Sequence, residues 1–155
     1  MIRIGTGYDV HRLVPERRLV LCGVEIPSDL GLLGHSDADV AVHALMDAIL
    51  GALAMGDIGK LFPDSDTQYK GADSMKLLAE VIRRMEGAGF RLGNLDLTII
   101  AERPKLAKHI PAMRESLAAA FGCDISQVSV KATTEEGLGL AGAGIGSQAV
   151  VLLEK

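Results

Sequence analysis

Aromatic residues are scarce in this sequence, which has no Trp, two Tyr and three Phe. Because 48% of the residues are nevertheless hydrophobic, the core must consist of Leu, Ile, Val, Ala and Met side chains. A chain of 155 residues buries roughly two thirds of its unfolded surface in one core, so we expect a single domain over residues 1–155. A core with so few large side chains would gain from further burial between subunits.

An excess of basic charge is also lacking. The formal net charge is −4 and the isoelectric point is near 5.5. No broad positive field is therefore available to hold a long polyanion, which excludes DNA and RNA as expected partners. A small phosphorylated ligand remains compatible with this charge, because metal ions and loop amides supply positive potential locally.

Segments that direct a chain to a membrane are absent as well. No apolar run approaches the roughly 18 residues that span a bilayer, and residues 1–10 lack the basic and apolar regions of a secretion signal. The two cysteines, Cys22 and Cys123, lie far apart and outside any Cys-x-x-Cys pattern. These absences predict a soluble, cytoplasmic protein with reduced thiols and no membrane partner.

The apolar pattern predicts both strands and helices. Alternating or continuous apolar residues predict strands at residues 1–10, 19–23, 95–99, 128–132 and 149–153. Helical spacing predicts helices at residues 37–54, 74–86 and 111–121, with Ser36 capping the first and Gly122 ending the third. Residues 56–71 show no sustained apolar period, and this lack predicts a mobile loop. The order of these strands and helices favours an α+β sandwich, in which helices cover one face of a mixed β-sheet. We expect this sandwich to be ferredoxin-like.

Asp9 and His11 lie two residues apart in the first predicted strand. In an extended segment both side chains leave one face while Val10 leaves the other, so the pair can chelate one cation. His43, in the first predicted helix, completes a set of two imidazoles and a carboxylate if that helix packs against the strand. Such a set leaves a fourth position open, as in catalytic zinc sites. The alternative is a hydrogen-bonded surface pair, with His43 an ordinary helix residue.

Residues 34–39, Gly-His-Ser-Asp-Ala-Asp, precede the first predicted helix. Backbone amides and the dipole at a helix amino terminus favour an anion, so a phosphate can bind beside His35 and Ser36. Asp37 and Asp39 already place negative charge there, and simple helix capping is the alternative interpretation.

Residues 137–142 match the letters Gly-x-Gly-x-x-Gly of a dinucleotide-binding fingerprint. An apolar strand follows at once and leaves no room for the helix, second strand and ribose-binding acid, so these residues are interpreted as a glycine-rich strand connection. Residues 131–136, Lys-Ala-Thr-Thr-Glu-Glu, combine a cation, hydroxyls and carboxylates at a strand end. This combination predicts a site for a phosphate and a second metal.

Five motifs occur in order along the chain: Asp9-Val10-His11, Gly-His-Ser-Asp at 34–37, Gly-Asp-Ile-Gly-Lys-Leu-Phe-Pro-Asp at 56–64, Pro104-Lys105, and Lys-Ala-Thr-Thr-Glu at 131–135. With these motifs the sequence resembles the 2-C-methyl-D-erythritol 2,4-cyclodiphosphate synthase family over almost its whole length. Five motifs at the family's spacing are far more specific than any one of them, and they favour the metal site over the surface pair.

The resemblance implies a homotrimer of α+β subunits with active sites between neighbours. It implies the substrate 4-diphosphocytidyl-2-C-methyl-D-erythritol 2-phosphate, whose 2-phosphate attacks the β-phosphorus and expels CMP. It also implies Zn²⁺ on Asp9, His11 and His43, and a second ion, Mg²⁺ or Mn²⁺, held on the diphosphate by Glu136.

By the same resemblance, His35 and Thr134 position and stabilise the transferring phosphoryl group as catalytic residues. Asp57 and Gly59 match a diol-binding stretch, and residues of the neighbouring subunit form the cytidine pocket. The implied substrate-binding residues are Asp9, His11, His35, Ser36, Asp57, Ile58, Gly59, Phe62, Pro63, Asp64, Ser65, Asp66, Ala101, Pro104, Lys105, Leu106, Ala107, Ala132, Thr133, Thr134, Glu135, Glu136 and Leu140.

This chemistry first requires neutralisation of several negative charges, which cations and hydroxyl or imidazole donors supply. The attacking phosphate is already an anion, so we expect no general base. Water would compete for the same phosphorus, and residues 61–70 are the expected lid. Two alternatives stay open: a non-catalytic module that binds nucleotide phosphates, and a metal-dependent phosphohydrolase.

Overall fold

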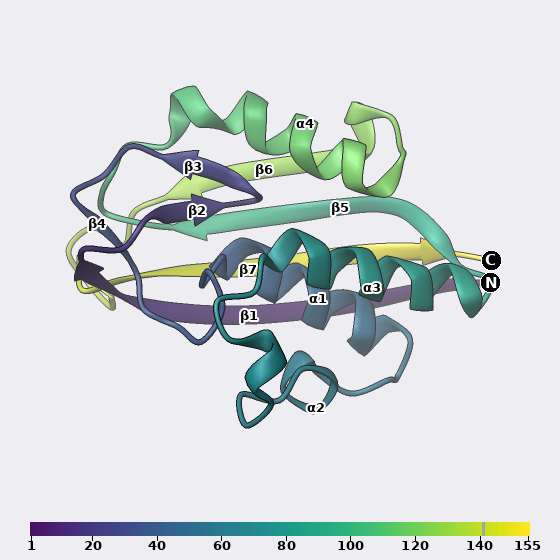
Figure 1. The fold of residues 1–155 in the computed structure, drawn as a ribbon. Coiled ribbons are helices and arrows are strands. Elements are labelled where there is room, and N and C mark those ends of the chain that lie inside the picture. The colour runs from purple at the N-terminus through teal and green to yellow at the C-terminus, as the bar shows by residue number, and fades with distance from the viewer. Residues whose placement is uncertain (141) are drawn as a thin grey trace.

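The computed structural model of the protein describes residues 1–140 and 142–155. Ala141, part of the predicted glycine-rich connection, lies outside the described residues. The described chain contains a five-stranded sheet in the order β4-β1-β7-β5-β6, with both chain ends at one edge of the molecule (Figure 1). Its strands are β1 (Ile2–Pro15), β4 (Leu30–Leu32), β5 (Arg91–Ile100), β6 (Val128–Thr133) and β7 (Gly144–Glu154).

The sheet is mixed, as predicted. β1 runs antiparallel to both β4 and β7, β7 runs antiparallel to β5, and β5 runs parallel to β6. A separate hairpin joins β2 (Leu19–Leu21) to β3 (Val24–Ile26). The sequence did not indicate β3 or β4, because three residues are too few to display alternation.

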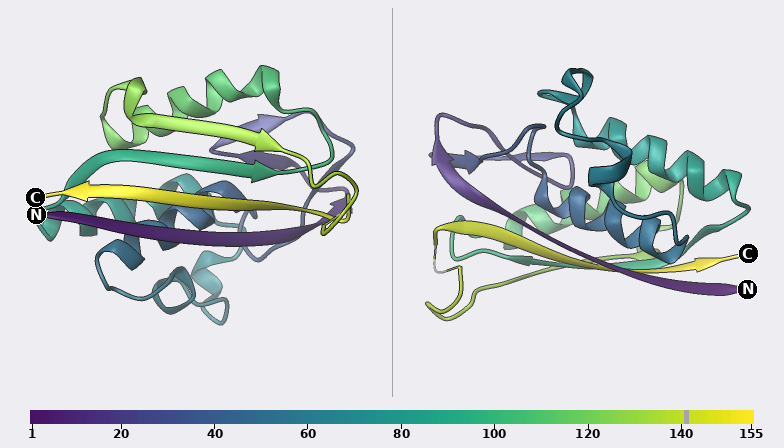
Figure 2. Two further views of the ribbon diagram at one scale, coloured as in Figure 1. Left: turned by 180° about the vertical axis from the view of Figure 1, so that it is seen from behind. Right: turned by 90° about the horizontal axis from the view of Figure 1, so that it is seen from below.

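Three long helices cover one face of the sheet, which confirms the predicted layering (Figure 2). They are α1 (Val40–Ala52), α3 (Ser74–Gly87) and α4 (Ile110–Phe121). α4 ends, as predicted, at Gly122, which adopts the left-handed conformation with φ 60°.

The predicted mobile loop over residues 56–71 is not free of regular structure. α2 (Ile58–Leu61) and a 3-10 turn (Thr67–Tyr69) lie within it, each begun by an aspartate that accepts a backbone N–H. Single turns of this kind depend on local capping and leave no period in the sequence. Two further 3-10 turns span Ala107–His109 and Ile125–Gln127.

The ferredoxin-like expectation is also wrong in its connectivity. That arrangement follows the order β-α-β-β-α-β. Here the core follows the order β1, α1 with α3, β5, α4, β6, β7, and the last strand inserts between β1 and β5. Because β5 and β6 are parallel, a crossover element must join them, and α4 is that element.

The start of α1 differs from the prediction, since Asp39 and not Ser36 is its cap. Ala38 has a positive φ of 56° that turns the chain after Ser36, so the helix begins only at Val40. The buried Asp39 carboxylate accepts the N–H groups of Cys22 at 3.0 Å, Gly23 at 2.8 Å and Val42 at 3.1 Å. Burial raises the pKa of Asp39 to about 6, although these three donors oppose the shift. Asp39 thereby attaches the β2–β3 hairpin to α1.

Glycines allow α1 to lie unusually close to β1. A Cβ atom on Gly5 would lie 1.9 Å from the carbonyl oxygen of Ala48, and one on Gly7 would lie 2.0 Å from that of Ala44. The backbone of β1 is therefore in direct contact with the backbone of α1, and no side chain lies between them. Asp9 and His11 continue the same face of β1 beyond these glycines, toward the first turn of α1.

The remaining core matches the composition. Buried residues are mainly Leu, Ile, Val, Ala and Met. Among the described residues, Phe90 is the one buried Phe, Tyr or Trp. Cys22 and Cys123 are both free thiols. Among the described residues, no helix is long and apolar enough to cross a membrane.

Candidate active site

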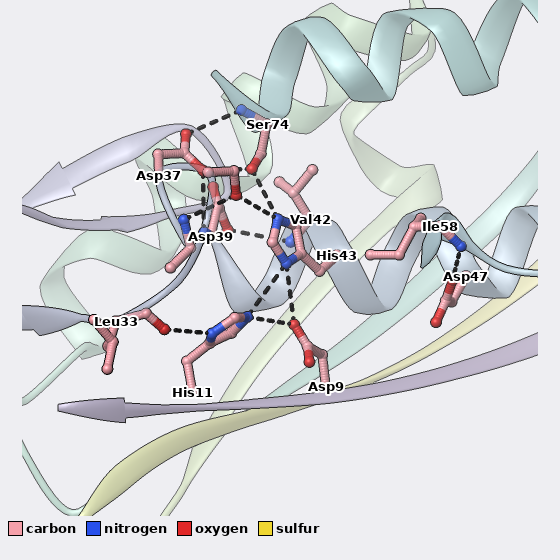
Figure 3. A network of polar contacts seen from close by, with 12 residues as sticks. Asp9, His11, Leu33, Asp37, Asp39, Val42, His43, Asp47, Ile58 and Ser74 are labelled. Atoms are coloured by element: carbon pink, nitrogen blue, oxygen red, sulfur yellow. Dashed lines mark hydrogen bonds and ion pairs between the residues drawn. The ribbon is translucent and has the colours of Figure 1, made fainter. Parts of the chain in front are cut away.

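Asp9, His11 and His43 meet where β1 passes the first turn of α1 (Figure 3). Oδ2 of Asp9 lies 2.9 Å from Nε2 of His11 and 3.1 Å from Nδ1 of His43. The two imidazole nitrogens lie 3.3 Å apart. The structure thus confirms that the predicted strand pair and the predicted helix residue come together, and it confirms that Val10 points to the opposite, exposed face.

The outward nitrogen of each imidazole also has a partner. Nδ1 of His11 lies 2.7 Å from the carbonyl oxygen of Leu33, which can only accept a hydrogen bond. His11 therefore carries its proton on Nδ1 when neutral and leaves Nε2 bare toward Asp9. Nε2 of His43 lies 3.0 Å from Oγ of Ser74 and 3.1 Å from Oγ of Ser36.

The short contacts shift the ionisation of the cluster. Burial raises the pKa of Asp9, but hydrogen bonds from His11 and His43 outweigh it and hold the pKa well below the usual value. The hydrogen bond to Asp9 raises the pKa of His11, and partial burial opposes that rise. In the absence of a cation, a carboxylate and a readily protonated imidazole therefore share the site.

The donor atoms fit a divalent cation. One carboxylate oxygen and two imidazole nitrogens form a set that zinc and other first-row divalent ions accept. A tetrahedral site with bonds of about 2.0–2.2 Å has its ligand atoms roughly 3.3–3.6 Å apart. The observed separations of 2.9, 3.1 and 3.3 Å are close to those values.

A cavity of about 430 Å³ opens beside this cluster. Nine residues predicted to bind substrate line it: Asp9, His11, His35, Ser36, Ile58, Gly59, Phe62, Pro63 and Asp64. Met46, Tyr69 and Leu77 also line it, and nothing in their sequence context beyond a helical or loop position indicates this role. Asp57, Ser65 and Asp66 lie in the same segment but do not line the cavity, and Asp57 instead caps α2.

The other predicted substrate residues form a second group at the ends of β5 and β6. None of them lines the cavity beside His43. They are Ala101, Pro104, Lys105, Leu106, Ala107, Ala132, Thr133, Thr134, Glu135, Glu136 and Leu140. One carboxylate oxygen of Glu102 accepts the N–H groups of Glu135 at 3.1 Å and Gly137 at 3.3 Å, and so anchors the turn that carries Glu136.

Several contributing side chains were not singled out in the sequence. Ser74 was predicted only as a helix start, yet its hydroxyl reaches His43. Asp47, one turn beyond His43 in α1, accepts the N–H of Ile58 at 2.8 Å and holds α2 beside the cavity. A buried serine or a helix aspartate has no distinctive spacing, so only the packing of distant segments reveals its contact.

Comparisons with known proteins agree over the full chain. The model of the YgbB family matches residues 2–154. The 2-C-methyl-D-erythritol 2,4-cyclodiphosphate synthase of Trichlorobacter lovleyi is 62% identical over 154 residues, which cover 98% of each chain. The enzyme of the same name from Syntrophotalea carbinolica is 65% identical over 157 residues, covering 100% of this chain and 96% of the relative.

A solved structure gives the same result. A 2C-methyl-D-erythritol-2,4-cyclodiphosphate synthase in its CDP-bound form matches with a TM-score of 0.92 and 43% identity, covering 98% of this chain and 100% of that one. At this identity and coverage the likeness extends beyond the fold. The chain therefore belongs to the YgbB family, together with these 2-C-methyl-D-erythritol 2,4-cyclodiphosphate synthases.

Proposed function

We propose that this protein is a metal-dependent lyase of isoprenoid biosynthesis that closes 2-C-methyl-D-erythritol 2,4-cyclodiphosphate. Its substrate is 4-diphosphocytidyl-2-C-methyl-D-erythritol 2-phosphate, and CMP leaves. The observation that carries the proposal is the convergence of Asp9, His11 and His43 at a cavity lined by other residues of the family motifs. The full-length relatives and the CDP-bound structure support the choice of substrate.

Asp9, His11 and His43 are proposed to hold Zn²⁺, and Glu136 a second ion, Mg²⁺ or Mn²⁺. Bound cations supply charge neutralisation for the phosphate oxygens of the substrate. The residues around them keep both imidazoles oriented, and Thr134 donates a hydrogen bond to Glu136 at 3.3 Å, which steadies that carboxylate. Glu136 itself lies in the turn after β6 and adopts a positive φ of 52°.

The protein's own contribution to the reaction is binding, orientation and exclusion of water. The 2-phosphate is already a nucleophilic anion, so no side chain is assigned as a base. His35 lines the cavity, and its buried Nε2 has no hydrogen-bond partner among the described residues, which suits it to contact a phosphoryl oxygen. Holding both phosphates of one molecule in place makes the attack intramolecular, and proximity then lowers the barrier by about 7–11 kcal/mol at best.

The erythritol portion is assigned to the cavity beside α2. Ile58, Gly59, Phe62, Pro63 and Asp64 line its wall, and Asp47 fixes the start of α2 through Ile58. The stretch of residues 61–70 is proposed as the lid that excludes water. Its aromatic side chains Phe62 and Tyr69 pack edge to face, with ring centroids 5.2 Å apart.

The cytidine portion is assigned to six residues of the second group on a neighbouring subunit: Ala101, Pro104, Lys105, Leu106, Ala107 and Thr133. None of these residues lines the cavity beside the metal cluster of the same chain, as expected of an active site shared between subunits. The open face of the sheet supports a homotrimer. On this face the apolar side chains of Ile2, Ile4, Tyr8 and Val10 are 66%, 66%, 57% and 42% exposed. An exposed apolar patch of this kind marks an interaction surface. Burial of this face would also compensate for the small aromatic content of the core.

The proposal is tested by phosphorus NMR of the protein with the proposed substrate, Zn²⁺ and Mg²⁺, followed by chelation. Metal-dependent release of CMP with a cyclic diphosphate is expected. His11→Ala should lose zinc and most of the activity while the assembly survives. Linear phosphate products would identify a phosphohydrolase, and unchanged substrate despite measured binding would identify a non-catalytic nucleotide-phosphate module.

A further inference from the structure

The nitrogen of His43 that faces away from Asp9 contacts two serine hydroxyls. Nε2 lies 3.0 Å from Oγ of Ser74 and 3.1 Å from Oγ of Ser36. A hydroxyl can donate or accept, so these distances alone do not say which atom carries the hydrogen. The direction follows from the other contacts that each hydroxyl makes.

The hydroxyl hydrogen of Ser74 is donated to Asp37 and not to His43. Oγ of Ser74 donates to Oδ1 of Asp37 in a short contact, and the backbone N–H of Ser74 donates to Oδ2 of the same carboxylate at 3.0 Å. An ionised carboxylate only accepts hydrogen bonds. Ser74 is fully buried, so no bulk water replaces Asp37 as the acceptor. Its oxygen therefore presents only lone pairs to His43, and the imidazole must donate from Nε2.

We propose that Asp37 and Ser74 are positioning residues. They orient His43 through its Nε2–H, so that Nδ1, which contacts Asp9 at 3.1 Å in the absence of a cation, is the nitrogen that a divalent cation takes. The inference rests on the proposed metal site. Imidazole ligands commonly donate their second N–H to a carboxylate or carbonyl, which fixes the ring and increases the basicity of the ligating nitrogen. Here the carboxylate acts through one intervening hydroxyl.

The chain of contacts joins two segments that are distant in the sequence. Asp37 precedes α1, Ser74 begins α3, and His43 lies in the first turn of α1 (Figure 3). The two metal-facing imidazoles are therefore fixed in different ways: His11 by the backbone carbonyl of Leu33, and His43 by a hydroxyl that a carboxylate orients. The second arrangement also brings a negative charge near the site without making Asp37 a ligand.

Ser36 must use its hydroxyl differently from Ser74. Its Oγ already accepts the N–H of Ala38 at 3.1 Å, and it cannot donate to a protonated Nε2 of His43. The hydroxyl hydrogen of Ser36 is then free for a ligand atom in the adjoining cavity, which Ser36 lines. This matches its proposed role in substrate binding.

The test compares Ser74→Ala and Asp37→Asn with the wild-type protein. Zinc affinity is measured by competition with a chromophoric chelator, and the visible spectrum of the Co²⁺-loaded protein reports the ligand geometry. Each variant should bind zinc about 10- to 100-fold more weakly, the usual effect of removing such a supporting contact. The Co²⁺ spectrum should change with it.

Asp73→Asn is the matched control. Asp73 precedes Ser74 at the same helix terminus. Its Oδ1 accepts the N–H of Met75 at 2.9 Å rather than contacting His43. The substitution removes the same charge and keeps a good helix cap. Its zinc affinity and Co²⁺ spectrum should equal those of the wild type.

Three results would overturn the inference. The first is unchanged zinc affinity in Ser74→Ala and Asp37→Asn. The second is an equal loss in Asp73→Asn, which would show a general charge effect. The third is a larger loss in Ser36→Ala than in Ser74→Ala, which would make Ser36 the acceptor. Failure of the wild type itself to bind zinc would contradict the proposed metal site instead, so the two failures are distinguishable.

Discussion

Nε2 of His11 lies 2.9 Å from Oδ2 of Asp9 on the face of β1 that meets α1. Hydrogen bonding to Asp9 raises the pKa of His11 from its ordinary 6.5. In metal-free protein the stability that this pair provides is therefore fully present below pH 6.5 and is lost as the pH rises through the raised pKa. The lowered pKa of Asp9 keeps the carboxylate charged throughout this range.

The first prediction concerns metal-free stability. With a chelator present, the wild type should exceed His11→Gln in free energy of unfolding by about 1–2 kcal/mol near pH 5.5. The difference should shrink as the pH approaches about 8.5, because glutamine does not titrate and the imidazole loses its charge. Urea unfolding at a series of pH values measures it, and a pH-independent difference would contradict the assigned ion pair.

Zinc affinity should rise with pH, whereas the stability provided by the Asp9–His11 pair falls. A cation and a proton compete for Nε2 of His11, so metal binding must release that proton wherever His11 is charged. We expect affinity to rise by about tenfold per pH unit below the His11 pKa and to level off above it. Chelator competition between about pH 5.5 and pH 8.5 measures the slope. A flat profile would show that His11 is not a ligand.

The position of His43 depends on the glycines of β1. A Cβ on Gly7 would lie 2.0 Å from the carbonyl oxygen of Ala44, the residue next to His43. Gly7→Ala should therefore push α1 away from β1, destabilise the fold by about 3 kcal/mol, and weaken zinc binding because Nδ1 of His43 moves from Asp9. Urea unfolding and chelator competition measure the two effects.

Gly87→Ala is the matched control for that substitution. Gly87 is the last residue of α3, and a Cβ there would have no heavy atom within 4 Å. Alanine should stabilise the helix by about 0.5–1 kcal/mol and leave zinc affinity unchanged. Equal behaviour of the two variants would contradict the role of the close β1–α1 contact.

These contacts explain what the sequence could and could not predict about the site. Asp9 and His11 follow from the period of a strand, which is a local property. His43 was predictable as a helix residue, but its approach to Asp9 depends on Gly5 and Gly7 removing the side chains between two backbones. Ser74 could not be paired with His43 from sequence, because 31 residues separate them and only the packing of α3 brings them together.

The errors in the fold have local causes. Ser36 matched a helix cap by type, but the positive φ of Ala38 delays the helix and gives the cap to Asp39. An alanine carries no signal for that conformation. The ferredoxin-like order failed because the same strands and helices are compatible with more than one sheet order, and long-range pairing of β7 between β1 and β5 decides it.

The proposed trimer should depend on the open face of the sheet. Ile4 is 66% exposed on β1, on the side opposite the helices. A glutamate there would be desolvated and brought near its symmetry copies if this face lies between subunits, and burying such unpaired charge costs several kcal/mol. Ile4→Glu should therefore reduce the mass measured by sedimentation equilibrium from trimer toward monomer. Because the active site is proposed to lie between subunits, its turnover should fall as well.

Ile125→Glu separates this effect from a general change in surface charge. Ile125 is 41% exposed in the turn before β6 and does not lie on β1. Its substitution adds the same charge and should leave mass and turnover near those of the wild type. If Ile4→Glu remained a trimer, the open face would not be the interface. If it became a monomer with full turnover, the cytidine pocket would have to be completed within one chain, and the assignment of the cytidine-binding residues to a neighbour would be wrong.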